Sequence, residues 1–285
     1  MNAVLADLIK VLELERLEIN LFRGVSRDLG LPQVFGGQVL GQAVAAASAT
    51  VTTDRLVHSL HAYFLLPGDV KAPIIYEVDR SRDGGSFSSR RVVAIQHGQP
   101  IFHMSASFQI AQSGLDHQSS MPIVPQPDNL ADIRDLVARA TDIPPELKRW
   151  FQVPLAIEFR PVNPDGLMSA NPSEPLTQFW FRAVDQLTDD AVLHRSLLAY
   201  ASDFYLLRTS TQPHGIAFPS ARLRLATIDH AMWFHRPVRV DDWLLYSIDS
   251  PSASGSRGLS RGSIYSRDGR LVASVAQEGM VRVKD

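Results

Sequence analysis

The chain has 285 residues, of which 45% are hydrophobic and 20% charged, and its formal net charge is −2. This composition is that of a globular rather than a disordered protein, and the length is more typical of two domains than of one. A near-neutral chain without a dense Lys/Arg cluster lacks the basic surface that nucleic acid requires, so we expect no nucleic-acid partner.

The absence of cysteine and of long apolar runs narrows the possibilities further. Without cysteine there is no disulfide, no thiolate metal ligand and no cysteine nucleophile. The longest apolar runs, such as Ala43–Ala47, are too short to span a membrane. The first ten residues do not resemble a secretion signal, and the chain does not end in Ser-Lys-Leu. We therefore expect a cytoplasmic protein without a membrane span.

The first half predicts one helix followed by strands. Small and apolar residues fill 38–49, which suits a helix enclosed by a sheet. Strand-forming residues begin at Ile74-Ile75-Tyr76, and a serine-rich loop is expected at 84–89. His97-Gly98 indicates a hairpin turn. The stretch 112–154 then contains repeated prolines, which predict a linker with one short helix near 130–140.

The second half repeats this order. A helix is expected over 190–207, with Thr188 or Asp189 as its N-cap, because apolar residues recur there at helical spacing. Leu244-Leu245-Tyr246 begins a strand, a serine-rich loop is expected at 252–260, and a hairpin turn at Asp268-Gly269.

Two short segments support an internal repeat with an offset of about 170 residues. Val57–Phe64 and Ala226–Trp233 both contain His-Ala with an aromatic residue two positions later, and a proline follows each segment, at Pro67 and Pro237. Two copies of a long helix on a curved antiparallel sheet make an α+β fold, and the two sheets could join edge to edge. We place the units at 1–112 and 154–285, with a linker at 113–153.

Two polar residues on apolar surfaces are the first candidates for chemistry. Asp203 lies beside the apolar stripe of the second helix, where a carboxylate costs desolvation unless it is paired or functional. In the strand 271–283, alternation puts Gln277 among Ala and Val side chains on one face. Thr227 lies on an apolar strand face as well, although threonine is common in strands.

Two sequence patterns resemble catalytic motifs, but their surroundings argue against that function. The pattern Gly258–Gly262 matches G-x-S-x-G, but a hairpin follows it and no histidine comes later in the chain. Asp229 and His230 look like an acid–base pair, but neighbouring strand residues point to opposite faces. There is also no dinucleotide, phosphate-loop or zinc-protease motif, so we expect no cofactor and no metal.

The duplicated positions and the arginines give weaker predictions. The repeat puts His58 near the position of Thr227 and Ser107 near that of Gln277, so we expect the two copies to have diverged. Four arginines border the serine-rich loops and could meet ligand phosphates, or they could be ordinary surface charges: Arg90, Arg91, Arg257 and Arg261.

Several segments together resemble a known family, the bacterial acyl-CoA thioesterase II (TesB-type) enzymes. They cover nearly the whole chain: 21–24, 33–38, 56–59, 64–69, 86–91, 200–203, 212–215, 226–237 and 275–279. The resemblance implies a double-hotdog fold, an acyl-CoA substrate hydrolysed to fatty acid and coenzyme A, and assembly into a homo-oligomer. It also implies a catalytic group at Asp203, Thr227 and Gln277, with a possible secondary role for His58.

The chemistry agrees with these residues, because a thioester can be attacked directly by a positioned water. Asp203 would be the general base, and Thr227 and Gln277 would hold the water. Two alternatives stay open: a hotdog enoyl-CoA hydratase, and a module that binds acyl-CoA without catalysis. Release of free thiol would distinguish the hydrolase from both.

Overall fold

The computed structural model describes residues 1–140, 148, 151, 153–164, 171–216 and 222–284. In the first unit, one helix precedes two short strands, and a second helix then precedes four longer strands that enclose it. Its elements are α1 (Ala3–Leu12), β1 (Glu15–Glu18), β2 (Leu21–Gly24), α2 (Gly36–Ser48), β3 (Arg55–Phe64), β4 (Ile74–Asp83), β5 (Phe87–Gln96) and β6 (Gln99–Ile110). Helix α2 begins two residues before the expected 38, and its small buried residues let the sheet pack closely around it.

The second unit repeats this arrangement after a connecting segment. That segment contains the 3₁₀ helix η1 (Pro127–Asn129) and α3 (Ile133–Arg139), which confirms the short helix expected near 130–140. The unit itself has β7 (Ile157–Pro161), β8 (Leu176–Ala183), α6 (Ala191–Ser202), the 3₁₀ helix η2 (Leu207–His214), β9 (Leu223–Thr227), β10 (Asp229–Phe234), β11 (Leu244–Ser254), β12 (Arg257–Ser266) and β13 (Leu271–Val283).

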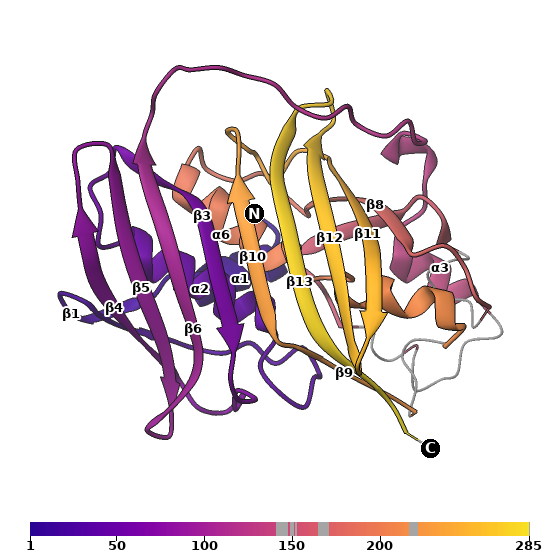
Figure 1. Cartoon of the computed structure of the whole chain (residues 1–285), viewed down its shortest axis with the longest axis horizontal. Coiled ribbons are helices and arrows are strands. Elements are labelled where there is room, and N and C mark those ends of the chain that lie inside the picture. Colours follow the sequence, from indigo (N-terminus) through magenta and orange to yellow (C-terminus); the bar gives the residue numbers. More distant parts are fainter. Residues whose placement is uncertain (141–147, 149–150, 152, 165–170, 217–221, 285) are drawn as a thin grey trace.

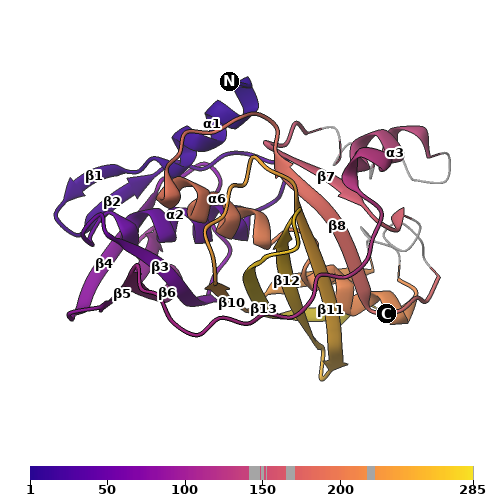
Figure 2. The same ribbon diagram turned by 90° about the horizontal axis from the view of Figure 1, so that it is seen from above.

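One thirteen-stranded sheet joins the units within the described residues, in the order β1-β2-β4-β5-β6-β3-β10-β13-β12-β11-β8-β7, with β9 also on β13. The junction is the antiparallel pair β3–β10, in which Asp229 lies opposite Tyr63 and Trp233 opposite Ser59. This confirms the edge-to-edge prediction, and each unit thereby covers an open strand edge of the other. Figure 1 shows the continuous sheet, and Figure 2 shows α2 and α6 together on its inner face.

Helices α2 and α6 approach closely because glycines of α2 face the α6 backbone. A Cβ on Gly41 would lie 2.9 Å from the carbonyl oxygen of Ser196, and one on Gly37 only 2.3 Å from that of Tyr200. The absence of a side chain at these positions is therefore what lets the helices cross at short range. This contact brings the beginning of α2 to the end of α6.

Helix α6 differs at both ends from the expected helix over 190–207. Its N-cap is Asp190, whose side chain accepts hydrogen bonds from the N–H groups of Val192 and Leu193, so the expected caps Thr188 and Asp189 are wrong. The helix ends at Ser202 with Asp203 as the C-cap, and Tyr205 then adopts a positive φ of 62°. Apolar residues continue at helical spacing to Leu207, although the helix ends at Ser202, because Leu206 and Leu207 are also buried.

The hairpins agree with their predicted turns, but one predicted loop is wrong. His97, Gly98 and Gly269 have positive φ angles of 50°, 74° and 89°, as tight turns require. The serine-rich stretch 252–260 is mostly strand, because β11 and β12 extend to a tight turn at Gly255-Ser256. The G-x-S-x-G pattern thus lies in strand β12, without the helix that a nucleophile elbow needs.

The described part of the expected linker lies against the second unit. The Gln118 side chain donates to the carbonyl of Gly269 and accepts from the N–H of Leu271. Farther along, the carbonyl of Pro125 accepts from the indole N–H of Trp180. Much of 141–152 lies outside the described residues, and the unit boundaries at 112 and 153 stay predictions. Among the described residues, no helix is long and apolar enough to cross a membrane.

Candidate active site

Asp203 lies where the end of α6 meets the beginning of α2. The α2 N-cap is Phe35, which has no capping side chain, so the first N–H groups of α2 need acceptors from elsewhere. The Asp203 carboxylate accepts one of them, the N–H of Gly37. A Cβ on Gly36 would lie 2.8 Å from Asp203 Oδ2, so the carboxylate rests directly on the helix terminus. The site therefore takes its acid from the second unit and its helix N-terminus from the first.

Gln277 joins Asp203 to Thr227. Its side chain is buried on the inner face of β13, and its Nε2 donates to Thr227 Oγ1 at 2.9 Å. The same amide hydrogen-bonds the Asp203 carboxylate. Thr227 is the last residue of β9, beside the break that separates this strand from β10. The fold thus brings together the three residues that were candidates from the sequence.

The acidity of Asp203 is set by opposing effects. Burial raises its pKa from the ordinary value to about 6, because the charged form loses hydration. The hydrogen bonds from Gly37 and Gln277 act in the opposite direction, since both stabilise the carboxylate. Asp203 is therefore largely ionised near pH 7 but far more basic than an ordinary aspartate, which suits a group that accepts a proton.

Behind Gln277 lies a buried histidine that is not part of the sequence-based group. His230 of β10 is fully buried, and its Nδ1 lies 2.7 Å from Gln277 Oε1. Its Nε2 lies 3.0 Å from the hydroxyl of Ser202, the last residue of α6. Asp229 points elsewhere and accepts from the backbone N–H of Glu278, which confirms that Asp229 and His230 are not a pair.

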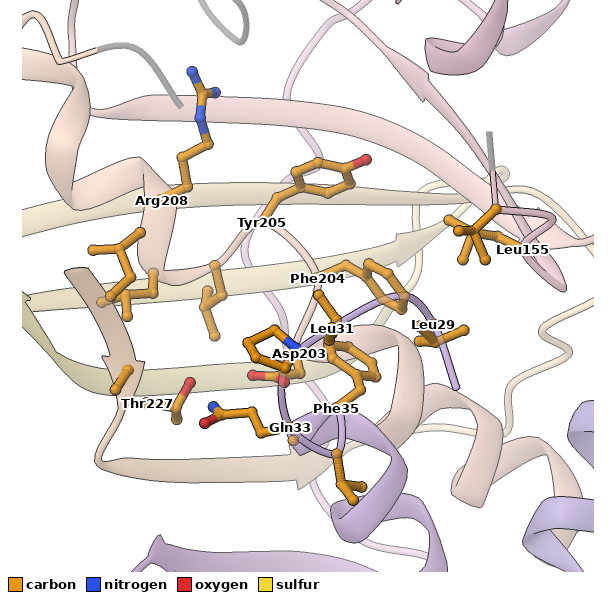
Figure 3. Close-up of a pocket in the computed structure, with 18 of the residues that line it drawn as sticks. Leu29, Leu31, Gln33, Phe35, Leu155, Asp203, Phe204, Tyr205, Arg208 and Thr227 are labelled. Carbon is orange, nitrogen blue, oxygen red and sulfur yellow. The ribbon is translucent and has the colours of Figure 1, made fainter. Parts of the chain in front are cut away.

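Two cavities meet at this group. The larger, of about 380 Å³, is bordered by Asp203, Thr227 and Gln277 and otherwise mainly by apolar side chains. Figure 3 shows Asp203, Gln33 and Thr227 on its wall, with Phe35 and Phe204 beside them. The second, of about 210 Å³, lies toward the first unit and shares Gln33 and Thr227 with the larger one. Thr227 therefore stands at the junction of two spaces.

The four arginines border neither of these two cavities. Arg90 is only 2% exposed and donates to Thr50 and Asp83 inside the first unit, so in this structure its guanidinium is engaged internally rather than presented to a ligand phosphate. Arg257 pairs with Glu278, and Arg261 pairs with Asp249 on the outer side of the sheet. Arg91 is an exposed residue of β5. The alternative of ordinary structural and surface charges fits these positions.

His58 lies away from the Asp203 group. It sits at a bulge of β3, where the register with β6 shifts between Val57 and Ser59. Its Nε2 lies 2.8 Å from Ser107 Oγ, on the face opposite to the buried neighbours Ala106 and Phe108. His58 borders neither described cavity. The structure therefore separates it from the acid, although its secondary role stays an untested prediction.

The strand pairing also corrects the predicted equivalence of the two copies. Val57 pairs with Phe108 in the first unit, and Thr227 pairs with Gly279 in the second. Arg90 pairs with Ala106, and Ser260 pairs with Gln277. Thr227 thus takes the position of Val57 rather than His58, and Gln277 that of Ala106 rather than Ser107.

Two contributors to the site were missed in the sequence. The N–H of Gly37 has no side chain to draw attention to it, although paired glycines at the beginning of a helix allow close approach of a ligand or a side chain. His230 was considered only as a partner of Asp229, and the contact with Gln277 crosses between strands. Among the described residues, no cluster of His, Asp and Glu could hold a metal ion.

Two family models match the chain. A model described as acyl-CoA thioesterase covers residues 159–280, and one described as acyl-CoA thioesterase N-terminal domain covers 27–109. The matches fall on the two structural units, one on each. The match over 159–280 includes Asp203, Thr227 and Gln277.

Full-length relatives agree with these models. Acyl-CoA thioesterase 2 of Haemophilus influenzae is 41% identical over all of both chains. Human acyl-coenzyme A thioesterase 8 is 44% identical over 96% of this chain and 88% of the relative. The crystal structure of an acyl-CoA thioesterase II from Mycobacterium marinum is 43% identical, with a TM-score of 0.81 over 98% of this chain and 99% of that one.

Proposed function

This chain belongs to the acyl-CoA thioesterase II family and hydrolyses acyl-CoA thioesters, and from that premise we propose that Asp203 activates the attacking water. Thr227 and Gln277 hold that water in place. One observation carries the proposal: the Asp203 carboxylate, with its raised pKa, lies beside Thr227 and Gln277 on the wall of an apolar cavity.

The reaction can be written with these groups alone. The water oxygen attacks the thioester carbonyl carbon while its proton passes to Asp203, which leaves a tetrahedral oxyanion. Collapse of this intermediate breaks the carbon–sulfur bond, and the leaving thiolate takes the proton back from Asp203. The products are a carboxylic acid and coenzyme A. The N-terminus of α2, whose Gly37 N–H donates to Asp203, carries a positive partial charge. This charge stabilises the developing negative charge of the oxyanion.

Family membership favours hydrolysis over the two alternatives, a hydratase and a non-catalytic binding module. The geometry supports the same choice. A hydratase would need a second acid–base group to protonate carbon. His230 contacts Gln277 and Ser202 and borders neither described cavity. Release of thiol from saturated acyl-CoA therefore tests the hydrolase directly.

The decisive experiment replaces Asp203 by asparagine, which keeps the size of the side chain but removes its basicity. We expect Asp203→Asn to lower kcat by about 10²-fold or more, the usual scale for a general base. In the wild type, kcat/KM should fall as the pH drops through about 6, because protonated Asp203 cannot accept a proton. Unchanged hydrolysis by Asp203→Asn would overturn the mechanism.

The thermal stability of the variant separates lost chemistry from lost structure. Because the folded-state pKa of Asp203 is raised, the ionised group destabilises the fold above pH 6, and this cost disappears as the pH falls toward 4. Asparagine avoids the cost at pH 7. We therefore expect Asp203→Asn to melt at the same or a higher temperature than the wild type, with the difference shrinking at pH 5.

The larger cavity is the proposed site of the acyl chain. Leu31, Leu155 and Ile133 border it together with other apolar residues, and its volume lies in the range of small-molecule pockets. The smaller cavity is bordered by the loop Leu65–Gly68 and lies on the other side of Thr227, so it is the proposed path of the pantetheine arm. A thioester lying across the junction presents its carbonyl to the water held there.

A wider side chain at Leu31 tests this assignment. Leu31 borders the larger cavity but not the smaller one. We expect Leu31→Trp to reduce kcat/KM at least 10-fold for the longest acyl-CoA that the wild type uses, with less than a threefold change for acetyl-CoA. An equal loss for all chain lengths would place the acyl chain elsewhere.

A further inference from the structure

The orientation of the Gln277 amide is fixed by its neighbours. An ionised carboxylate only accepts hydrogen bonds, so the amide must turn its NH₂ group toward Asp203. The same NH₂ group donates to Thr227 Oγ1 at 2.9 Å. The carbonyl oxygen of Gln277 therefore points the other way, toward His230, and there it requires a donor.

His230 can be that donor in only one tautomer. The distance from Gln277 Oε1 to His230 Nδ1 is 2.7 Å, so Nδ1 must carry the hydrogen. The neutral ring then has a lone pair on Nε2, which lies 3.0 Å from Ser202 Oγ. The Ser202 hydroxyl donates to the carbonyl oxygen of Ala199 at 2.9 Å. Its single hydrogen also reaches the Nε2 lone pair at 3.0 Å when the two acceptors share it in a bifurcated bond. Burial lowers the pKa of His230 to about 4, so the ring stays neutral near pH 7.

We propose that His230 is a positioning residue that, oriented by Ser202, holds the Gln277 amide with its NH₂ group toward Asp203 and Thr227. It does so without bordering either described cavity, so it acts through Gln277 rather than on the substrate. This inference rests on the proposed function of Asp203. If the amide turned over, its oxygen would face the carboxylate, and Asp203 would lose the hydrogen bond that favours its charged form.

The first unit shows that packing alone does not require a histidine here. Leu60 pairs with Ala106 in β3 and β6, at the positions that His230 and Gln277 hold in β10 and β13. A leucine therefore fits a strand of this sheet at that position. The polar chain Ser202–His230–Gln277 is fully buried, and buried polar groups of this kind are costly unless each finds a partner.

The test compares His230→Leu with His230→Asn. Leucine removes the donor, whereas the side-chain amide of asparagine can place an N–H near the position of Nδ1. We expect His230→Leu to lower kcat by about 10- to 100-fold, as misplacement of a positioned group does, with KM within twofold. It should also move the acid limb of kcat/KM to higher pH, because Asp203 loses the hydrogen bond that favours its charged form. His230→Asn should restore the limb and most of kcat.

The other groups that face Asp203 do not titrate in this range. The charge of Asp203 acts on the phenols of Tyr200 in α6 and Tyr246 in β11, and burial raises the pKa of each phenol well above its usual value. The remaining neighbours that hydrogen-bond it are the N–H of Gly37 on α2 and the amide of Gln277 on β13. A shift of the acid limb therefore reports on the Gln277 amide.

A second pair of variants keeps the proposal testable if His230→Leu does not fold. Ser202→Ala removes the hydroxyl that selects the tautomer, so it should shift the limb in the same direction, with a smaller loss of kcat. Ser196→Ala is the matched control, because Ser196 is equally buried on α6 and its hydroxyl contacts none of these groups. The control should behave like the wild type.

The outcomes separate the two proposals. If His230→Leu and Ser202→Ala keep kcat within twofold and leave the acid limb in place, the positioning role is overturned even when Asp203→Asn is inactive. If Asp203→Asn is fully active, the proposed function fails first. A loss of kcat in His230→Leu that His230→Asn does not restore, with an unmoved limb, would indicate a structural role only.

Discussion

The two units share a fold, but only the second contains the group formed by Asp203, Thr227 and Gln277. The C-cap of α6 is Asp203, whereas the C-cap of α2 is Ala49. The strand pairing extends this contrast, since Val57 and Ala106 stand where the second unit has Thr227 and Gln277. Each polar member of the candidate site thus has an apolar counterpart in the first unit.

The corresponding space in the first unit is also filled. Arg90 holds the position of Ser260 and is almost fully buried. It donates to the hydroxyl and the carbonyl of Thr50, which follows α2, and to Asp83. This long side chain occupies the position at which the second unit has the short Ser260 beside Gln277.

The N-termini of α2 and α6 also differ in how their first N–H groups are capped. Asp190 caps α6 with its own side chain, whereas α2 begins without a side-chain cap and receives Asp203 from the other unit. A second, symmetric site would need a free α6 N-terminus and an acid at the end of α2, and the chain has neither. The first unit therefore has no acid at the end of its helix, but it supplies the helix N-terminus that binds the acid of the second unit.

The largest effects on activity are expected when residues of the second unit are replaced by their counterparts in the first. Gln277→Ala and Thr227→Val should each lower kcat by about 10- to 100-fold, because the water loses a fixed partner. Thiol release from a good acyl-CoA substrate measures the effect. The reciprocal change Val57→Thr is the control and should leave kcat within twofold. A Gln277→Ala enzyme as active as the wild type would mean that the polar residues do not define the site.

A second test asks whether the buried Arg90 stabilises the first unit without affecting activity. Arg90→Met keeps an unbranched chain but leaves the buried hydroxyl and carbonyl of Thr50 without their donor, which costs about 1–3 kcal/mol of unfolding free energy. Denaturant unfolding measures this loss, while kcat at a temperature well below melting should stay within twofold. Arg91→Met, on the exposed neighbouring residue, is the control and should change stability by less than about 0.5 kcal/mol.

The smallest effect is expected at His58. This histidine contacts Ser107 and Phe87 in the first unit and borders neither described cavity. We expect His58→Gln to keep kcat/KM within twofold of the wild type across the pH profile. A tenfold loss with normal stability would restore a catalytic role to the first unit and contradict the division between scaffold and site.

Much of this site was visible in the sequence. Asp203 and Gln277 stood out because a carboxylate and an amide on apolar surfaces need a reason to be there. The internal repeat also indicated the two units and their edge-to-edge sheet. The family segments then connected these residues to thioester chemistry.

The errors came from features that sequence order does not display. The bulge at His58 and the longer turn between β12 and β13 shift the register by one residue, and in a strand one residue changes the face. The predicted counterparts of Thr227 and Gln277 were therefore wrong by one position. The burial of Arg90 was not predicted either, because burial depends on what packs above a strand.

Residue order alone was enough to predict the duplicated pattern, most helices and strands, and the side chains with the chemistry to act. Which of these side chains meet depends on the folded chain. Asp203 is joined to Gly37 of the other unit, and His230 to Gln277 and Ser202 on three separate elements. Local periodicity sets the face on which a residue lies, whereas contacts between distant elements depend on how helices cross and sheets join, and these follow from packing of the whole chain.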